Sequence, residues 1–240
     1  MSVGERINQR IQGMRVLITG GGSGIGLATA LQLHKLGARV AVLSNNAAEF
    51  TNLAAGMFSY EADVRSREQV TTAIQSFTDE VGGIDAVINA AGVSLWKPFL
   101  EMDDAFWDLI YDVNVKGTFL VNQAVAPFMM QQGGGFILNI ASMSAVKSGM
   151  PEASAYASSK WAIVGFSRNL HLELKPHGIR VACFCPGSTR TPLHDQAQTP
   201  NREQMFVPDD IADSLIFMLA APKNGHIQLL AQPAMFEEWR

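Results

Sequence analysis

The sequence predicts a single α/β domain in which helices cover both faces of a parallel β-sheet. Along the 240 residues, short apolar runs alternate with longer segments of helical periodicity, and strand–helix–strand units of this kind connect through right-handed crossovers. The strand candidates are apolar throughout, as in Val40-Ala41-Val42-Leu43, which is expected when both faces of a sheet are covered. The length suits one such domain, and no internal repeat or change of composition marks a second.

Each element has its own local signal. The apolar runs that predict strands lie at 15–19, 39–44, 57–60, 84–90, 136–140, 179–185 and 227–230. Helices are expected from Gly24, after Ser66 with its capping partner Gln69, after Asp103, over about 153–174 and over 208–219. Residues 1–13 are predicted to form a polar N-terminal arm. The irregular stretch 188–207 is predicted to be a substrate lid, because a long loop in a compact domain is commonly functional.

Composition disfavours several classes of function. The net charge is −4 and no basic block occurs, so a nucleic-acid partner is not expected. No apolar stretch approaches the roughly 18–20 residues of a membrane span, and residues 1–13 lack the apolar core of a signal peptide. We therefore expect a cytoplasmic protein with no membrane partner. The two cysteines, Cys183 and Cys185, would share one face of a strand, where buried thiols in a reducing compartment are favoured over a disulfide or a metal site.

A glycine-rich turn follows the first strand and leads directly into a helix. Its sequence, Thr19-Gly20-Gly21-Gly22-Ser23-Gly24-Ile25-Gly26, lets the backbone turn sharply and approach a ligand closely. The N-terminus of the following helix presents unpaired N–H groups and the positive end of the helix dipole to a pyrophosphate. A P-loop is disfavoured, because no Gly-Lys-Ser/Thr follows. The turn therefore predicts dinucleotide binding through Gly20, Gly22, Ser23, Gly24, Ile25 and Gly26.

The end of the second strand bears on the choice of dinucleotide. An acid about 20 residues past the glycines would bind the ribose 2′-hydroxyl, but this end of the strand has the sequence Leu43-Ser44-Asn45-Asn46. Without a carboxylate there to repel a 2′-phosphate, NADP(H) is favoured, with Ser44 and Asn45 as its contacts. NAD(H) stays possible, because no Arg or Lys stands beside Ser44 to hold the phosphate.

Tyr156 and Lys160 lie four residues apart in a helical segment, so their side chains share one face. Tyrosine has a reference pKa of about 10, and a nearby cation lowers it, which makes the pair a candidate acid/base. This spacing alone is also common in surface helices. Ser142 favours the functional interpretation, because it follows a strand whose carboxyl end is where such sheets bind ligands. Its hydroxyl can hydrogen-bond both Tyr156 and a substrate oxygen, and its alternative role is to cap a turn.

Taken together, these residues resemble the single-domain branch of the short-chain dehydrogenase/reductase family, with motifs in family order from Thr19 to Thr191. Asp63-Val64 looks like the pair that contacts adenine, and Asn89-Ala90-Ala91-Gly92 looks like the Asn-Ala-Gly signature after the fourth strand. Pro186-Gly187, with Thr191, looks like the motif that packs beside the nicotinamide. The positions that match the family's catalytic tetrad are Asn114, Ser142, Tyr156 and Lys160.

The resemblance implies a doubly wound, Rossmann-type domain with a seven-stranded parallel sheet. It implies an NAD(P)-dependent oxidoreductase that moves hydride between the nicotinamide and a small carbonyl or alcohol substrate. In that mechanism Tyr156 exchanges the proton, Lys160 holds the ribose hydroxyls and lowers the Tyr156 pKa, Ser142 orients the carbonyl, and Asn114 positions a water of a proton relay. The implied cofactor contacts also include Asp63, Val64, Asn89, Ala90, Gly92, Tyr156, Lys160, Pro186, Gly187, Thr189 and Thr191. A homodimer or homotetramer is implied, built on two long helices at about 103–131 and 153–174.

Two features depart from the family pattern. Ser142 lies one residue further from Tyr156 than expected, which leaves Ser144 as a rival. The usual C-terminal Val-Asp-Gly-Gly is replaced by residues 225–230 followed by Pro233-Ala234. This ending resembles that of some NADP-dependent members and leaves the oligomeric state open. His194, within the expected lid, is a further candidate for substrate contact.

Two other functions compete with this interpretation. A dinucleotide-binding sensor or scaffold without turnover would usually lack the tyrosine or the lysine, and this chain has both. A sugar-nucleotide epimerase or dehydratase shares the pair but usually carries a C-terminal substrate domain, for which 240 residues leave no room. An oxidoreductase acting on a carbonyl or alcohol is therefore the function that the sequence predicts.

Overall fold

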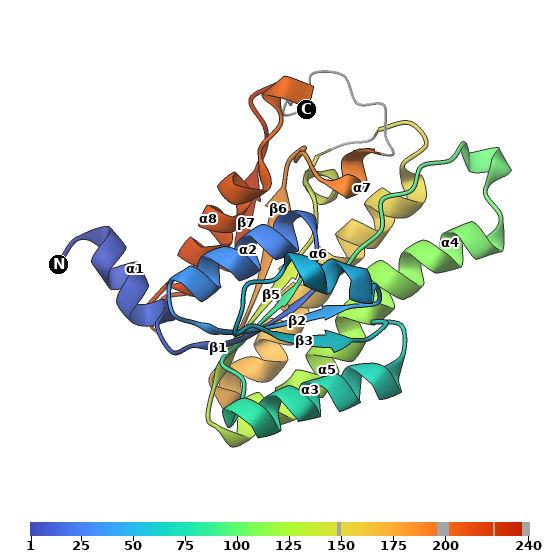
Figure 1. Cartoon of the computed structure of the whole chain (residues 1–240). Coiled ribbons are helices and arrows are strands. Elements are labelled where there is room, and N and C mark those ends of the chain that lie inside the picture. Colours follow the sequence, from blue (N-terminus) through green and yellow to red (C-terminus); the bar gives the residue numbers. More distant parts are fainter. Residues whose placement is uncertain (148–149, 196–201, 223, 237–240) are drawn as a thin grey trace.

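The computed structural model describes residues 1–147, 150–195, 202–222 and 224–236. At its centre is one sheet of seven parallel strands in the order β3-β2-β1-β4-β5-β6-β7, with helices on both faces (Figure 1). The strand order reverses between β1 and β4, which makes the sheet doubly wound and confirms the predicted Rossmann-type fold. The strands are β1 (Arg15–Thr19), β2 (Arg39–Ser44), β3 (Phe58–Glu61), β4 (Ala86–Asn89), β5 (Gly135–Ile140), β6 (Ile179–Pro186) and β7 (Leu229–Gln232).

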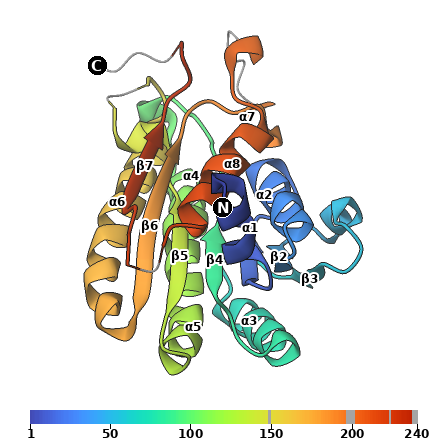
Figure 2. The same ribbon diagram turned by 90° about the vertical axis from the view of Figure 1, so that its left-hand side faces the viewer.

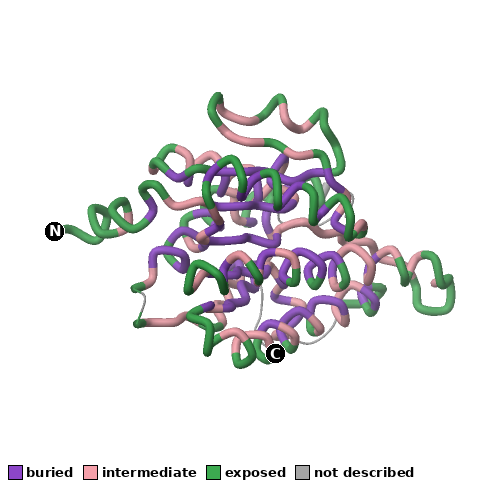
Figure 3. Tube along the Cα trace, turned by 90° about the horizontal axis from the view of Figure 1, so that it is seen from below, coloured by how far each residue is buried: buried purple, intermediate pink, exposed green. Residues whose placement is uncertain are grey.

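Two main apolar cores lie on opposite faces of the sheet. Alternate residues of a strand point to opposite faces, so Val16 and Ile18 of β1 enter one core while Leu17 enters the other. The covering helices are α2 (Gly24–Lys35), α3 (Arg67–Val81), α5 (Thr118–Gln131), α6 (Ser154–Leu174) and α8 (Pro208–Leu219). Helices α2 and α8 pack on the first core, whereas α3 and α5 pack on the second and α6 lies along β6. Figure 3 shows that the buried parts of the trace concentrate between these layers.

The N-terminal residues form a helix that the sequence interpretation missed. Helix α1 (Val3–Ile11) begins with a capping box, in which the Ser2 hydroxyl accepts from the Glu5 N–H and the Glu5 carboxylate accepts from the Ser2 N–H. Figure 2 shows α1 beside α8, where Arg10 Nη1 donates to the Ala220 carbonyl over 2.6 Å and Ile11 is fully buried. The predicted arm is therefore docked on the domain.

The long helix expected after Asp103 is interrupted by a π-helical turn. Helices α4 (Asp104–Tyr111) and α5 are joined by a π-helical segment, Asp112–Gly117. Within it, the Asn114 carbonyl accepts from Thr118 Oγ1 over 2.7 Å. Such bulges are frequent at functional sites, and this one contains Asn114, a position of the predicted tetrad.

Strand boundaries lie within two residues of the prediction. The largest shifts are two residues. Strand β4 begins at Ala86 where residue 84 was predicted, and β7 begins at Leu229, which pairs with Cys183, where residue 227 was predicted. The expected lid is described over 188–195 and 202–207, which include the short helix α7 (Pro192–Asp195). A bridge between Thr189 and Phe206 joins the two ends of this segment.

Candidate active site

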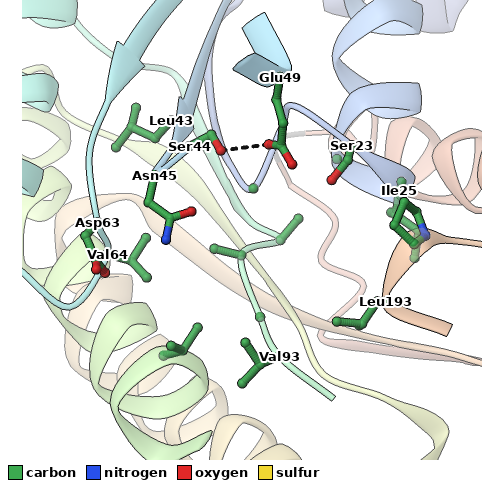
Figure 4. Close-up of a pocket in the computed structure, with 18 of the residues that line it drawn as sticks. Ser23, Ile25, Leu43, Ser44, Asn45, Glu49, Asp63, Val64, Val93 and Leu193 are labelled. Carbon is green, nitrogen blue, oxygen red and sulfur yellow. Dashed lines mark hydrogen bonds between the residues drawn. The ribbon is translucent and has the colours of Figure 1, made fainter. Parts of the chain in front are cut away.

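The carboxyl ends of β1, β2 and β4 open onto a cleft of about 400 Å³. Ligands of doubly wound sheets bind at this edge, where the strand order reverses. Figure 4 shows its walls: the glycine turn, the end of β2, the segment after β3 and the loop after β4. The predicted cofactor residues that line it are Gly20, Ser23, Gly24, Ile25, Gly26, Ser44, Asn45, Asp63, Val64, Ala90, Gly92 and Thr191.

The glycine turn contains close approaches that require glycine. Gly20 has a φ of +63°, and a Cβ there would lie 2.7 Å from the Ala91 Cα. At Gly26 a Cβ would overlap the Gly20 carbonyl oxygen. Ser23, the N-cap of α2, makes no side-chain bond to the first turn, so this residue leaves the N–H groups of the turn for a ligand. These features fit the pyrophosphate of a dinucleotide.

The Tyr156 hydroxyl lies between two serines. Ser142 caps a short turn after β5, Met143–Ala145, and Ser94 belongs to the loop after β4. Burial raises the pKa of Tyr156, and the neighbouring Ser142 and Ser94 hydroxyls lower it by less, because they can donate to the phenolate. The net shift is upward, whereas the sequence interpretation expected a lowering by Lys160. The hydroxyl is therefore protonated near neutral pH.

Lys160 lies one helical turn from Tyr156 and is 7% exposed. Its Nζ donates to the Ile140 carbonyl over 3.1 Å and lies 5.7 Å from the centroid of the Tyr156 ring. Burial lowers the pKa of Lys160 to about 8, because the charged form is poorly solvated there. A Cβ at Gly92 would lie 3.5 Å from this Nζ, so the glycine keeps the approach from the cleft to Lys160 open.

Asn114 holds the loop after β4 in place. Its Nδ2 donates to the Val93 carbonyl over 3.0 Å and to Ser159 Oγ over 3.1 Å. Its Oδ1 accepts from the Val93 N–H over 2.8 Å. The side chain is 1% exposed, so in this structure Asn114 joins the cleft loop to α6, a contact that the resemblance did not imply.

The structure brings Ser142, and not its rival Ser144, to the Tyr156 hydroxyl. Ser144 contributes its backbone N–H, which donates to Ser142 Oγ over 3.1 Å. Ser94 was missed by sequence reasoning, because a serine in an irregular loop carries no spacing signal. Trp96 Nε1 donates to Ser94 Oγ over 3.2 Å and so orients that serine. The side chain of His194 lies outside the described part of the structure.

Several predicted cofactor residues do not line the cleft. Asn89 is buried behind it, where its Nδ2 donates to Asn122 Oδ1 over 2.6 Å and to Asn139 Oδ1 over 2.8 Å. Thr189 is 3% exposed and donates to the Gly187 carbonyl over 2.9 Å. Asn89 and Thr189 therefore support the ends of the strands through buried hydrogen bonds and do not line the cleft. The predicted positions without a place in the lining are Gly22, Asn89, Tyr156, Lys160, Pro186, Gly187 and Thr189.

Among the described residues that line the cleft, three side chains are charged: Asp63, Arg65 and Glu49. Asp63 accepts from Arg65 Nη2 over 2.6 Å and from Arg65 Nε over 3.0 and 2.9 Å. The bond to Arg65 holds the pKa of Asp63 below its usual value. Glu49, which the sequence interpretation did not consider, reaches the cleft from the 3-10 helix Ala47–Asn52.

These features define a dinucleotide-binding α/β protein with a tyrosine–lysine pair at its ligand edge, and comparison with known proteins assigns the family. A family model described as short chain dehydrogenase matches residues 14–202. The chain therefore belongs to the short-chain dehydrogenase/reductase family of oxidoreductases.

Individual relatives agree with this assignment. An uncharacterized oxidoreductase of Staphylococcus aureus strain USA300 is 33% identical over 217 residues, which cover 88% of this chain and 93% of that protein. A short-chain dehydrogenase/reductase of Armillaria gallica is 38% identical over 199 residues, covering 78% and 76%. Among solved structures, a 7α-hydroxysteroid dehydrogenase in complex with NADH and 7-oxoglycochenodeoxycholic acid is similar with a TM-score of 0.89 and 30% identity, covering 97% of this chain and 96% of that one.

The described residues contain neither a metal-ligand cluster nor a membrane-spanning helix. No cluster of three or more His, Cys, Asp or Glu side chains could hold a metal ion there. Over the same ranges, no helix combines the length and apolarity needed to span a bilayer.

Proposed function

We propose that this protein is an NAD(P)(H)-dependent oxidoreductase that interconverts a small carbonyl compound and its alcohol, with Tyr156 as the acid/base. One observation carries the proposal: the buried Lys160 Nζ lies 5.7 Å from the centroid of the Tyr156 ring, and the Ser142 and Ser94 side chains are near enough to the Tyr156 hydroxyl to lower its pKa. The family membership and the relative that binds NADH support the choice of cofactor class.

Residues that line the cleft, together with Lys160 beside it, would hold a nicotinamide dinucleotide at several points. The first turn of α2 and the close-packed glycines would hold the pyrophosphate, while the end of β2 would hold the adenosine ribose. Asp63 and Val64 would contact the adenine, and Lys160 would meet the other ribose. When bound, the nicotinamide supplies hydride to the carbonyl carbon or takes it from the alcohol carbon.

The remaining chemistry belongs to the protein. Ser142 would donate a hydrogen bond to the substrate oxygen beside the Tyr156 hydroxyl. In reduction, Tyr156 gives its proton to that oxygen as the negative charge develops. Because burial raises the pKa of Tyr156, its protonated form prevails near neutral pH, and this favours proton donation and therefore carbonyl reduction. Alcohol oxidation requires the phenolate and is favoured at higher pH.

Replacing Tyr156 by Phe tests the catalytic role. This change removes only the hydroxyl, so turnover across a panel of carbonyls and alcohols should fall at least about 100-fold, the size of a typical acid/base contribution. Binding of NADH or NADPH, followed by fluorescence, should stay within about twofold of wild type. Ser144→Ala is the matched control, because its side chain is not bonded to Tyr156 and its activity should be retained. Undiminished activity of Tyr156→Phe would overturn the assignment.

We also propose a homodimer or homotetramer in the cytoplasm. Helices α4, α5 and α6 carry large apolar side chains that the single chain leaves exposed, including Trp107 at 40% and Trp161 at 54%, and burial in a subunit contact would remove them from water. Cys183 and Cys185 are both free and buried, as suits a reducing compartment. Light scattering on the purified protein tests the oligomer.

A further inference from the structure

The short helix that follows β2 is tied to both sides of the cofactor cleft. At its start, the Asn46 side chain accepts from the Ala48 N–H over 3.2 Å. Near its end, Asn52 Nδ2 donates to the Gly22 carbonyl of the glycine turn over 3.2 Å. Between these contacts, the carboxylate of Glu49 accepts from Ser44 Oγ over 2.7 Å. The position of Glu49 is thus set by the N-cap of its own helix and by contacts with two other segments, the end of β2 and the glycine turn.

Glu49 occupies the space that the glycine turn leaves open. A Cβ at Gly22 would overlap the Glu49 carboxylate and lie 2.5 Å from its Cβ, so the glycine makes room for this side chain. Figure 4 shows the Glu49 side chain pointing toward Ser44, with Ser23 on the other side of the same opening. The carboxylate therefore lies where the last residue of β2 meets the turn that would hold the pyrophosphate.

The charge of Glu49 is not balanced by a neighbouring cation. Across residues 1–147, 150–195, 202–222 and 224–236, no Lys or Arg forms an ion pair with it. Within the described lining of the cleft, Arg65 is the one Lys or Arg side chain, and its guanidinium is paired with Asp63. A 2′-phosphate, which carries roughly 1.5 to 2 negative charges near pH 7, would meet an unpaired carboxylate here.

We infer that Glu49 selects NAD(H) over NADP(H), by accepting a hydrogen bond from the adenosine ribose 2′-hydroxyl and repelling a 2′-phosphate. Dinucleotide-binding folds commonly place this acid at the end of the second strand, where this chain has Ser44. In this chain the carboxylate is that of Glu49, five residues after Ser44 and in the following short helix. Its hydrogen bond with the Ser44 hydroxyl directs it to the end of the second strand. The inferred preference is opposite to the NADP(H) preference that the sequence favoured from the end of β2 and from the C-terminal ending.

The inference rests on the proposed function, so its test measures binding rather than turnover. Dissociation constants of NADH and NADPH are measured by fluorescence titration for wild type, Glu49→Gln and Glu61→Gln. Gln keeps an oxygen that can accept from Ser44 but removes the charge. Glu61 is the matched control. It lies on β3 directly opposite Ser44 of β2, but its side chain is exposed and does not line the cleft.

We expect wild type to bind NADH at least about tenfold more tightly than NADPH, which corresponds to about 1.4 kcal/mol. Glu49→Gln should reduce this ratio about tenfold, chiefly by improving NADPH binding, while Glu61→Gln leaves the ratio unchanged. Glu49→Arg should reverse the preference.

Four results would count against these conclusions. NADPH binding as tight as NADH in wild type would overturn the inference, as would equal ratios in wild type and Glu49→Gln or an equal response in Glu61→Gln. If neither dinucleotide binds to folded wild type at millimolar concentration, the proposed function itself fails, and the inference fails with it.

Discussion

Replacing Asn114 by Ala should destabilise the protein through the loop after β4. The side chain is 1% exposed and makes three hydrogen bonds, two to the backbone of Val93 and one to Ser159 Oγ. At about 1 kcal/mol per bond, the free energy of unfolding should fall by about 3 kcal/mol. In a domain of this size, about 1 kcal/mol lowers Tm by roughly 2–4 °C, so a drop of about 6–12 °C is expected.

The measurement is urea and thermal unfolding of the cofactor-free protein, followed by far-UV circular dichroism. Ser159→Ala provides a double-mutant cycle, because Ser159 shares one of the three bonds and also donates to the Tyr156 carbonyl over 2.6 Å. The double variant should be more stable than the sum of the single effects predicts, by about 1 kcal/mol. A loss below about 1 kcal/mol for Asn114→Ala, or full additivity in the cycle, would refute the view that this side chain anchors the loop.

Two further substitutions test the site through stability. Burial lowers the folded-state pKa of Lys160 to about 8, whereas a solvated lysine in the unfolded chain has a pKa of about 10.4. The unfolded chain therefore binds more protons between these two pH values, and wild-type stability should rise with pH through that window. Lys160→Met removes the buried charge and should be more stable than wild type at pH 7 by up to about 3 kcal/mol, with a gain that shrinks toward pH 10; equal stability at pH 7 in denaturant unfolding would contradict this. Gly20→Ala should lower stability by at least about 1–2 kcal/mol and weaken dinucleotide binding, because the φ of Gly20 is +63° and its Cβ would meet Ala91. Gly165→Ala, at a helical position of α6 with open space around the added Cβ, should instead gain roughly 0.5–1 kcal/mol, and a loss at Gly165 as large as that at Gly20 would show that steric contact is not the cause.

Stability and function oppose one another at Lys160. A methionine would fit the apolar surroundings that lower the pKa of this lysine, yet the proposed mechanism needs a cation beside Tyr156 and the ribose. We therefore interpret the buried charge of Lys160 as a loss of stability that is retained because the proposed mechanism needs it. The large apolar cores on both faces of the sheet can offset this loss.

Local sequence determined much of this protein. The alternation of apolar runs with helical segments indicated a parallel α/β sheet, because strands buried on both faces must be apolar along their whole length. The glycines of the cofactor turn were readable because a positive φ and close backbone approach exclude other residues. Tyr156 and Lys160 were readable as a pair because a helix brings residues four apart onto one face.

Only the tertiary structure decided which side chains meet across the cleft. Ser94 reaches Tyr156 from another strand's loop, Glu49 reaches Ser44 from a helix without a periodic signal, and Asn114 joins two distant segments. The net upward shift of the Tyr156 pKa and the lowering at Lys160 also depend on burial, which is a property of the packed domain. Local rules describe the backbone and neighbours within a few residues, whereas hydrogen bonds and desolvation depend on groups that only chain folding brings within a few ångströms of each other.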